Sequence, residues 1–295
     1  MNARTKAHLA LLIVALIYGV NYIIAKEVMN GFVGPRAFIV LRVVGASTLF
    51  WLFHAFNRSE RKIERKDWFR VIASGFFGVA CNQILFFEGL NLTTPINASV
   101  IMTGNPILVL LMSAIILKEP IRRWRLFGIF LGGAGAVYLI LGRGDANLLS
   151  SDTSLGNLFV LINATSYAIY LVVVKPLMAK YQPLQVIKWV FVSGLMFVLP
   201  VGLTQVTEIE WNTFTPAIWA QVAFVIIATT FIAYLFNIYA LKTVSSTTVS
   251  IYVYTQPLFA TAVSLWLGKD VLTWPIVVSA TLIFAGVYLV SFSKK

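Results

Sequence analysis

The sequence predicts an all-α membrane protein with ten transmembrane helices, arranged as two inverted repeats of five helices each. Composition is the first observation behind this prediction. Hydrophobic residues make up 59% of the 295 residues and charged residues only 12%, whereas charged residues supply about a quarter of a soluble globular domain. The second observation is a series of ten apolar runs, and the third is a stretch of the fourth run that recurs in the ninth.

The ten apolar runs are each long enough to cross a bilayer, which takes about 20 predominantly apolar residues. The first run ends at Lys26 and Glu27 without a small-residue cleavage site, so we expect it to stay in the protein as a span. The connections between runs are too short for a soluble domain. The runs lie near residues 8–27, 35–56, 68–88, 95–117, 122–142, 155–175, 183–204, 216–240, 245–267 and 273–292.

An internal repeat relates the two halves of the chain. Residues 97–119 match residues 248–270 at an offset of 151, and the first and fifth spans match the sixth and tenth at offsets of 149 and 150. Five crossings are an odd number, so the second copy must enter the membrane from the opposite face. We therefore expect two inverted repeats, residues 1–148 and residues 149–295. Equivalent pairs include Tyr18 and Tyr167, Lys26 and Lys175, Ser99 and Ser250, and Pro106 and Pro257.

Positive charges predict the orientation, because cytoplasmic loops retain lysine and arginine. With the N-terminus inside, eighteen of the 23 basic residues fall on the inner side. Both termini are thus expected in the cytoplasm, and the absence of long loops suits a bacterial inner membrane. The net charge of +12 is explained by this bias, so we assign the chain no nucleic-acid partner.

Polar residues within the spans predict a transport site, since such residues are costly in hydrocarbon and should face a cavity or another helix. In the sixth span, four polar residues share one helical face at the spacing i, i+3, i+4 and i+7. Hydrogen bonding between helices is the alternative explanation. The stripe consists of Asn163, Ser166, Tyr167 and Tyr170, and the first span contributes Tyr18, Asn21 and Tyr22.

The fourth and ninth spans each carry polar residues one and two turns before a proline. Pro106 and Pro257 free the carbonyls of Met102 and Val253, which can then bind a ligand or a neighbouring hydroxyl. A kink that serves packing alone is the alternative. The candidate substrate-binding residues in these spans are Ser99, Thr103, Ser250 and Tyr254, and the third and eighth spans add Asn82, Gln83, Phe86, Tyr234 and Asn237. Aromatic walls with amide and hydroxyl groups suit an uncharged or zwitterionic small molecule.

Three charged residues near the spans have gating or structural roles in this interpretation. Arg42 lies deep enough that it should either snorkel to the interface or find a partner, and Glu88 is a candidate partner for an outer gate. Two independently hydrated residues are the alternative. Lys188 can be aligned with Arg42 only by changing the offset. Acidic residues are confined to loops and span ends, so a proton relay of buried acids is unsupported.

Two other classes of function are alternatives to transport. An intramembrane enzyme needs paired aspartates, a zinc motif or a serine with a histidine base, and the aspartates and both histidines lie in loops or toward span ends. We therefore predict no catalytic residue, metal or cofactor. A membrane scaffold without transport activity is the second alternative. Gly128 and Gly132 have the G-x-x-x-G spacing that packs either a homodimer or two helices of one chain.

Four motifs resemble those of the EamA branch of the drug/metabolite transporter superfamily. The first is the stretch Tyr18-Gly19-Val20-Asn21-Tyr22, and the others follow in the second, fourth and fifth spans. They are Leu41-Arg42, Asn105-Pro106 followed by Lys118-Glu119, and Gly132-Gly133-Ala134-Gly135. The resemblance implies a ten-helix secondary transporter that moves small metabolites, often amino acids, by alternating access. We expect an exporter whose partners are a small-molecule substrate and the lipid bilayer.

Overall fold

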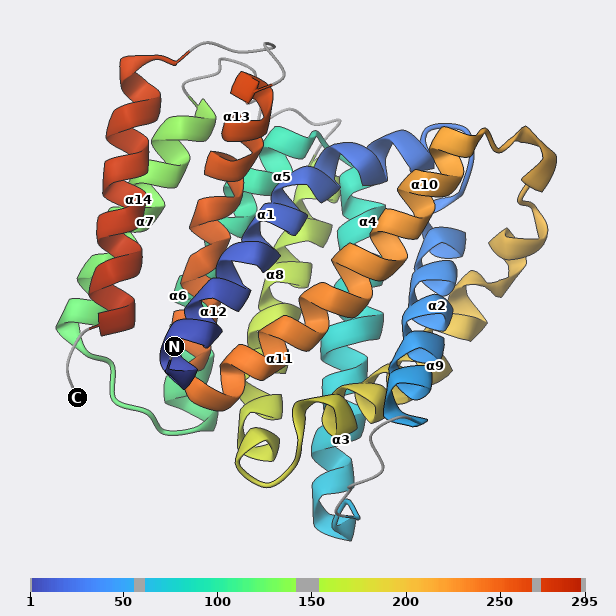
Figure 1. The fold of residues 1–295 in the computed structure, drawn as a ribbon, viewed down its shortest axis with the longest axis horizontal. Helices are drawn as coiled ribbons and strands as arrows, with labels where there is room; N and C mark the ends of the chain where they lie inside the picture. The colour runs from blue at the N-terminus through green and yellow to red at the C-terminus, as the bar shows by residue number, and fades with distance from the viewer. Residues whose placement is uncertain (1, 56–61, 142–153, 267–271, 293–295) are drawn as a thin grey trace.

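The computed structural model describes residues 2–55, 62–141, 154–266 and 272–292, and within these residues it is helical without any strand (Figure 1). In the first repeat the elements are α1 (Ala3–Met29), α2 (Pro35–Ala55), η1 (Arg65–Asp67), α3 (Trp68–Gly75), η2 (Phe76–Cys81), α4 (Asn82–Leu92), α5 (Pro95–Met102), α6 (Asn105–Ile116) and α7 (Arg123–Leu141). In the second repeat they are α8 (Ser154–Val174), η4 (Lys175–Ala179), α9 (Pro183–Thr207), η5 (Trp211–Thr213), α10 (Pro216–Phe224), η6 (Val225–Ile232), α11 (Ala233–Thr243), α12 (Ser246–Ile251), η7 (Tyr252–Thr255), α13 (Gln256–Trp266) and α14 (Trp274–Phe292).

The prediction of membrane-spanning helices is confirmed. Eight helical stretches in the described residues are long and apolar enough to cross a bilayer. The remaining two predicted runs correspond to α7 and to the broken helix α12–η7–α13. Large apolar side chains such as Phe130, Met196 and Phe284 are exposed on the outside of the bundle, as expected for side chains that face lipid. The predicted boundary between residues 148 and 149 lies outside the described residues.

Several helices begin at a capping residue followed by proline. Thr94 accepts a hydrogen bond from the Asn97 backbone at the start of α5, and Thr215 does the same for Ile218 at the start of α10. Proline at the first helical position has no N–H to leave unpaired. The turn after α1 passes through Gly31, whose φ of 90° favours a residue without a Cβ.

The helices pair across the two repeats. α7 packs on α14 and α2 on α9, which joins the fifth span to the tenth and the second to the seventh. α4 packs on α8 while α1 packs on α11, so the contact of spans three and six recurs between spans eight and one. In Figure 1 α1 rises from the N-terminus and α8 descends, so the two equivalent helices run in opposite directions. This reciprocal pairing is what an inverted repeat requires.

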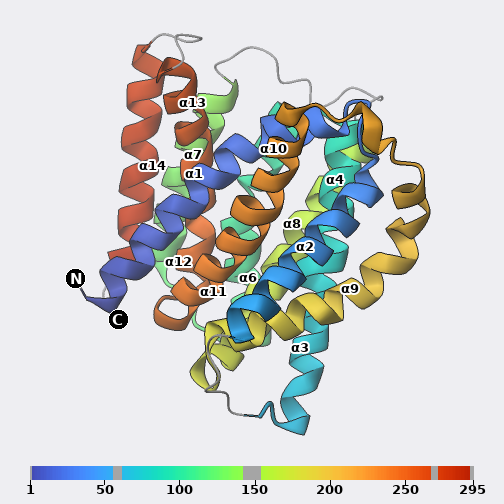
Figure 2. The same cartoon turned by 45° about the vertical axis from the view of Figure 1, so that its right-hand side comes forward.

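Both ends of the described chain lie on one face of the bundle. α1 begins and α14 ends on the same side in Figures 1 and 2, and the Arg4 side chain donates a hydrogen bond to the Ser291 carbonyl. We call this face the inner face and the opposite one the outer face, after the expected orientation.

Two equivalent lysines cap equivalent helices. The Lys26 ammonium group donates hydrogen bonds to the carbonyls of Leu90 (2.7 Å) and Thr93 (3.3 Å) at the end of α4. Lys175 donates to the carbonyls of Leu241 and Val244 at the end of α11. A cation there satisfies carbonyls that have no helical partner and complements the negative end of the helix dipole. The same contact therefore occurs at the outer end of one repeat and the inner end of the other.

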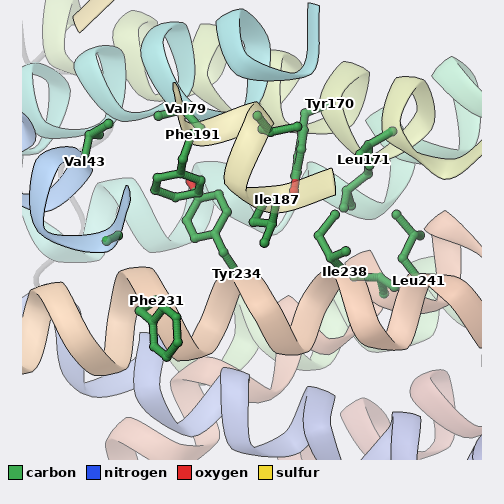
Figure 3. Close-up of a cluster of buried hydrophobic side chains, with 14 of the residues drawn as sticks. Val43, Val79, Tyr170, Leu171, Ile187, Phe191, Phe231, Tyr234, Ile238 and Leu241 are labelled. Atoms are coloured by element: carbon green, nitrogen blue, oxygen red, sulfur yellow. The ribbon is translucent and has the colours of Figure 1, made fainter. Parts of the chain in front are cut away.

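An aromatic and aliphatic cluster fills the space between α2, α8, α9 and α11 (Figure 3). Phe191 contacts Tyr234 edge to face with ring centroids 5.0 Å apart, and Phe50 lies 4.8 Å from Phe231. Tyr234 also lines the cavity described below, so the packed core holds one wall of the candidate site in place.

Gly128 and Gly132 pack two helices of the same chain. A Cβ on Gly286 of α14 would lie 2.6 Å from the Gly128 carbonyl oxygen and 2.6 Å from the Gly132 backbone nitrogen. These glycines therefore allow α7 and α14 to approach closely, which is the second of the two roles considered for their spacing.

Candidate functional site

A cavity of about 90 Å³ lies between the two repeats. One water occupies about 10–15 Å³ of such space, so the cavity has room for a solute of roughly six to nine non-hydrogen atoms. Nine helical segments of the two repeats contribute to its walls. The lining residues are Tyr18, Asn21, Arg42, Asn82, Gln83, Phe86, Phe87 and Met102 from the first repeat and Asn163, Tyr167, Thr229, Tyr234, Val253 and Gln256 from the second.

Many of the residues chosen from the polar stripes lie in this lining. They come from the first, third, sixth and eighth spans, so the fold brings four stripes that are far apart in the sequence to one place. These residues are Tyr18, Asn21, Asn82, Gln83, Phe86, Asn163, Tyr167 and Tyr234.

Other candidates from the same spans do not line the cavity. The Ser166 hydroxyl donates a hydrogen bond to the Phe77 carbonyl (2.7 Å) and so joins α8 to η2. Tyr170 packs flat on Gly78, where a Cβ would lie only 2.3 Å from the ring. Asn237 is buried in α11 outside the lining. The side chain of Tyr22 is outside the described part of the structure.

The four polar candidates of the fourth and ninth spans also lie outside the lining. Thr103 and Ser250 each donate to a carbonyl three residues earlier, those of Val100 (2.6 Å) and Thr247 (3.0 Å). Such local bonds satisfy a hydroxyl without any ligand. Ser99 is likewise absent from the lining. Tyr254 is buried against Gly132, where its ring would lie 2.6 Å from an added Cβ.

The fourth and ninth spans are nevertheless interrupted beside the cavity. α5 ends at Met102 and α6 begins at Asn105, while α12 and α13 are separated by the short 3₁₀ segment η7. Pro106 is the second residue of α6, and Pro257 is the second residue of α13. Met102 and Val253, whose carbonyls the prolines cannot bond, both line the cavity. Discontinuous helices of this kind form the substrate sites of many transporters.

Equivalent π-helical segments occur in the third and eighth spans. They are η2 (Phe76–Cys81) and η6 (Val225–Ile232). The wide turn leaves carbonyls available to neighbouring side chains, and the Gly78 carbonyl accepts a hydrogen bond from Tyr234 (2.9 Å). Such segments are rare and often lie at functional sites. Here they fix the third and eighth spans to their neighbours on the cavity wall.

The proposed gate between Arg42 and Glu88 does not form. Glu88 pairs with Arg36, whose Nε lies 2.6 Å from its Oε1. Arg42 is six residues further along α2, which is about 9 Å of helix rise, and only 4% of it is exposed. Its Nε donates to the Thr230 hydroxyl (2.9 Å) and its guanidinium carbon lies 4.5 Å from the Phe87 ring centroid.

Lys188, which aligns with Arg42 only when the offset is changed, has a different environment from Arg42. It is buried in α9 outside the cavity, and its ammonium nitrogen lies 4.5 Å from the Trp51 ring centroid and 5.7 Å from that of Trp189. Both contacts are cation–π interactions. The two cations therefore have different contacts, although the helices that carry them, α2 and α9, pack on each other.

Four buried oxygens of the lining make no hydrogen bond within the described residues. They are Asn21 Oδ1, Gln83 Oε1, Asn163 Oδ1 and Thr229 Oγ1. Buried polar atoms in proteins are normally hydrogen-bonded, so these four are unsatisfied polar atoms within residues that line the cavity. His, Cys, Asp and Glu do not come together in groups of three that could hold a metal anywhere in the described residues.

Sequence reasoning missed several lining residues. Met102 and Val253 were named only for their carbonyls, and Arg42 only as a gate. Gln256 corresponds to Asn105 at the offset of 151, so a polar residue precedes the proline in both repeats, and this signal was available. No signal distinguished Phe87 or Thr229 from other residues of their spans.

These features define a polytopic membrane protein built as an inverted repeat around a central cavity lined by aromatic rings, amides and an arginine, which is the architecture of secondary transporters. The chain belongs to the EamA-like transporter family, which matches it twice, over residues 5–141 and 154–292.

Curated relatives cover nearly the whole chain. An "uncharacterized transporter" of Archaeoglobus fulgidus is 27% identical over 289 residues, 98% of each chain. The "uncharacterized transporter YyaM" of Bacillus subtilis is 24% identical over 96% of this chain and 93% of its own length. A crystal structure with 18% identity covers 99% of this chain and 96% of its own, with a TM-score of 0.76, which supports the fold.

Proposed function

We propose that the protein is a secondary transporter that exports small metabolites such as amino acids across the plasma membrane by alternating access of its two repeats. The observation that carries this proposal is the cavity, which both repeats line with tyrosines and amides and which has the size of a small solute. The interrupted helices beside it supply backbone groups for binding. The distribution of positive charges supports a cytoplasmic location of both termini.

Counterflow in proteoliposomes tests the proposal. Labelled amino acids, sugars and nucleosides are offered to the wild-type protein and to Tyr167→Ala and Asn21→Ala, which alter the cavity lining. We expect one class of solute to move and both substitutions to reduce its flux at least tenfold. Tyr138→Ala is the matched control, because this tyrosine is exposed on the lipid-facing side of α7, and it should retain flux.

Two other outcomes contradict parts of the proposal. An absence of flux across the whole panel, with folded protein, favours the scaffold alternative. Uptake by right-side-out vesicles against a gradient, with none by inverted vesicles, contradicts the export direction.

A further inference from the structure

We propose that a groove on the lipid-facing side of the bundle binds one anionic phospholipid of the inner leaflet, with its phosphate at Lys6 and Lys242 and an acyl chain against α1 and α11. The groove has a volume of about 470 Å³, against about 90 Å³ for the central cavity. No residue lines both. The groove is therefore separate from the cavity of the proposed function, and the inference does not depend on the transported solute.

Helices of both repeats form the walls of the groove. Residues of α1, of α11 and of the start of α9 line it, and α11 packs on both of the other helices. α1 and α11 lie side by side on the near side of the bundle in Figure 1. Leu9 and Ile13 of α1 are 43% and 45% exposed, so the groove opens on the outside of the bundle. Its occupant contacts both repeats.

The apolar part of the groove lies at the depth of the hydrocarbon. Ile13 falls within the predicted span 8–27, while Leu235 and Phe236 fall within the predicted span 216–240. The bilayer core holds no water, and apolar side chains on the outside of a bundle face acyl chains there. The occupant of an apolar groove at this depth is therefore the chain of a lipid.

The charged residues of the groove gather at its inner end. Lys6 lines the groove, and Lys242 lies beside it and donates to Oε1 of the lining residue Gln182 at 3.3 Å. Each lysine is two residues beyond the inner end of its predicted span, at the level of the headgroups. Ile13 and Leu235 are seven residues further along α1 and α11, which is about 10 Å of helix rise. The groove therefore has the polarity of a phospholipid in the inner leaflet.

The charge of the groove favours an anionic headgroup. No acidic residue of the described chain belongs to its lining, and neither lysine takes part in an ion pair between described residues. A lysine has three N–H donors, and Lys242 uses one of them on Gln182. Basic pockets between spans on the cytoplasmic side are typical sites for anionic headgroups. We therefore expect phosphatidylglycerol to bind in preference to zwitterionic phosphatidylcholine.

Native mass spectrometry of the full chain tests this assignment. The protein is released from detergent that contains equal amounts of phosphatidylglycerol and phosphatidylcholine with the same acyl chains. Each lysine near an anionic lipid contributes about a fivefold preference. We expect the wild-type protein to retain one phosphatidylglycerol, with a preference of about twenty-five-fold over phosphatidylcholine from the two lysines together.

Removal of the two positive charges tests the headgroup contact. Lys6→Gln and Lys242→Gln should each lower the preference about fivefold, and the double variant should retain the two lipids almost equally. Arg123→Gln is the matched control, because Arg123 is an exposed cation at the inner end of α7. This control should keep the wild-type preference.

Filling the apolar part of the groove tests the acyl-chain contact. Ile13→Trp places a larger side chain where the lipid chain lies, so retention of both lipids should be lost. Phe130→Trp is the matched control, since Phe130 is 58% exposed on α7, and it should retain phosphatidylglycerol as the wild-type protein does.

Four outcomes overturn the inference. Equal retention of the two lipids by the wild-type protein contradicts the anionic headgroup. Retention that neither the double lysine variant nor Ile13→Trp changes assigns the lipid to another surface. Release of phosphatidylglycerol by excess inorganic phosphate makes the phosphate group alone the ligand. A dimer that Ile13→Trp dissociates makes the groove an interface between two copies of the chain. None of these outcomes depends on flux, so a failure of the proposed function leaves the inference standing.

Discussion

The two repeats contact each other once at the inner face and once at the outer face. The two contacts occupy equivalent places in the repeat but differ in chemistry. On the inner face, the Tyr181 hydroxyl and the Lys180 ammonium group both donate to Asp67 Oδ2, each at 2.8 Å. On the outer face, the Phe32 ring lies edge to face with Phe214 at 6.2 Å. Phe32 corresponds to Tyr181 at the offset of 149.

Each contact joins the first loop of one repeat to the start of the third span of the other. Inner and outer contacts are therefore related by the same inverted symmetry as the helices. The inner contact is ionic and includes Glu64, 3.7 Å from Lys180, whereas the outer contact is aromatic and extends to Trp219, 5.0 Å from Phe214. The repeat therefore retains a contact at the same place on both faces. Because the inner contact is ionic and the outer one aromatic, we expect their contributions to stability to depend differently on salt and pH.

The largest effect is expected at the outer contact. Phe214→Ala removes a ring that packs on Phe32, Trp211 and Trp219 and should lower the free energy of unfolding by about 3 kcal/mol. The loss should be the same at low and high salt, because no charge is involved. Denaturant unfolding in detergent measures it, with the exposed Phe284→Ala as control. A loss that changes with salt would contradict the aromatic character of this contact.

A smaller but salt-dependent effect is expected at the inner contact. Asp67→Ala removes the acceptor shared by Lys180 and Tyr181 and should cost about 2 kcal/mol, because hydrogen bonds to charged groups are worth about 1.5–3 kcal/mol. The cost should shrink at high salt, as screening weakens the wild-type ion pair. The same unfolding assay applies, and Glu208→Ala, at an exposed outer site, should be neutral. Equal costs at both salt concentrations would argue against an ionic contact.

Tyr181→Phe makes the inner ring chemically like its outer counterpart. It removes the hydroxyl that donates to Asp67 and accepts from the Glu64 backbone at 3.0 Å, and it should cost about 1 kcal/mol. The reverse change, Phe32→Tyr, adds a hydroxyl that the aromatic contact does not use, so a change below about 0.5 kcal/mol is expected. Equal effects of the two substitutions would mean that the hydroxyl is not what distinguishes the faces.

The smallest effect is a pH dependence of the inner contact. The hydrogen bond to Asp67 raises the pKa of Lys180 above its ordinary value of 10.5, so its contribution is complete below that pH and lost as the pH rises further. The hydrogen bond from Lys66 lowers the pKa of Glu64 below 4.5, so its contribution is complete above that pH and lost as the pH falls. Wild-type stability minus that of Lys180→Met, measured from pH 4 to 11, should be flat in the middle and decline at both ends. A decline centred near pH 7 would assign the contact to other groups.

The sequence predicted the spans, the repeat and much of the cavity, because each depends on periodicity. Residues such as Asn163 and Tyr167 are spaced by one helical turn, so they lie on the same face of the folded helix. Ser166 shares the stripe but bonds to Phe77, because the π segment η2 offers a carbonyl that a regular α-helix would not. One extra residue in a turn rotates the following residues by about 100°, and nothing in the sequence of η2 or η6 marks that insertion.

The partner of Arg42 was mispredicted for a similar reason. Glu88 is a candidate partner because it lies near the outer end of the third span, but Arg36 pairs with it at the first turn of α2. The sequence shows how deep a residue lies along its helix. It does not show how the helix is rotated about its axis, and the packing of α2 on α4 sets the rotation that brings Arg36, and not Arg42, to Glu88.

The lysine caps have a consequence for how the chain is threaded into the bilayer during synthesis. In the expected orientation Lys26 must be translocated, against the tendency of positive residues to stay inside, and the carbonyls that receive it belong to the end of α4. A nascent chain that stops after the second span has no such receptor for Lys26. The orientation of its first span in the bilayer is therefore less strongly determined than in a chain that extends past Thr93. The topology becomes fixed only after the third span has been inserted.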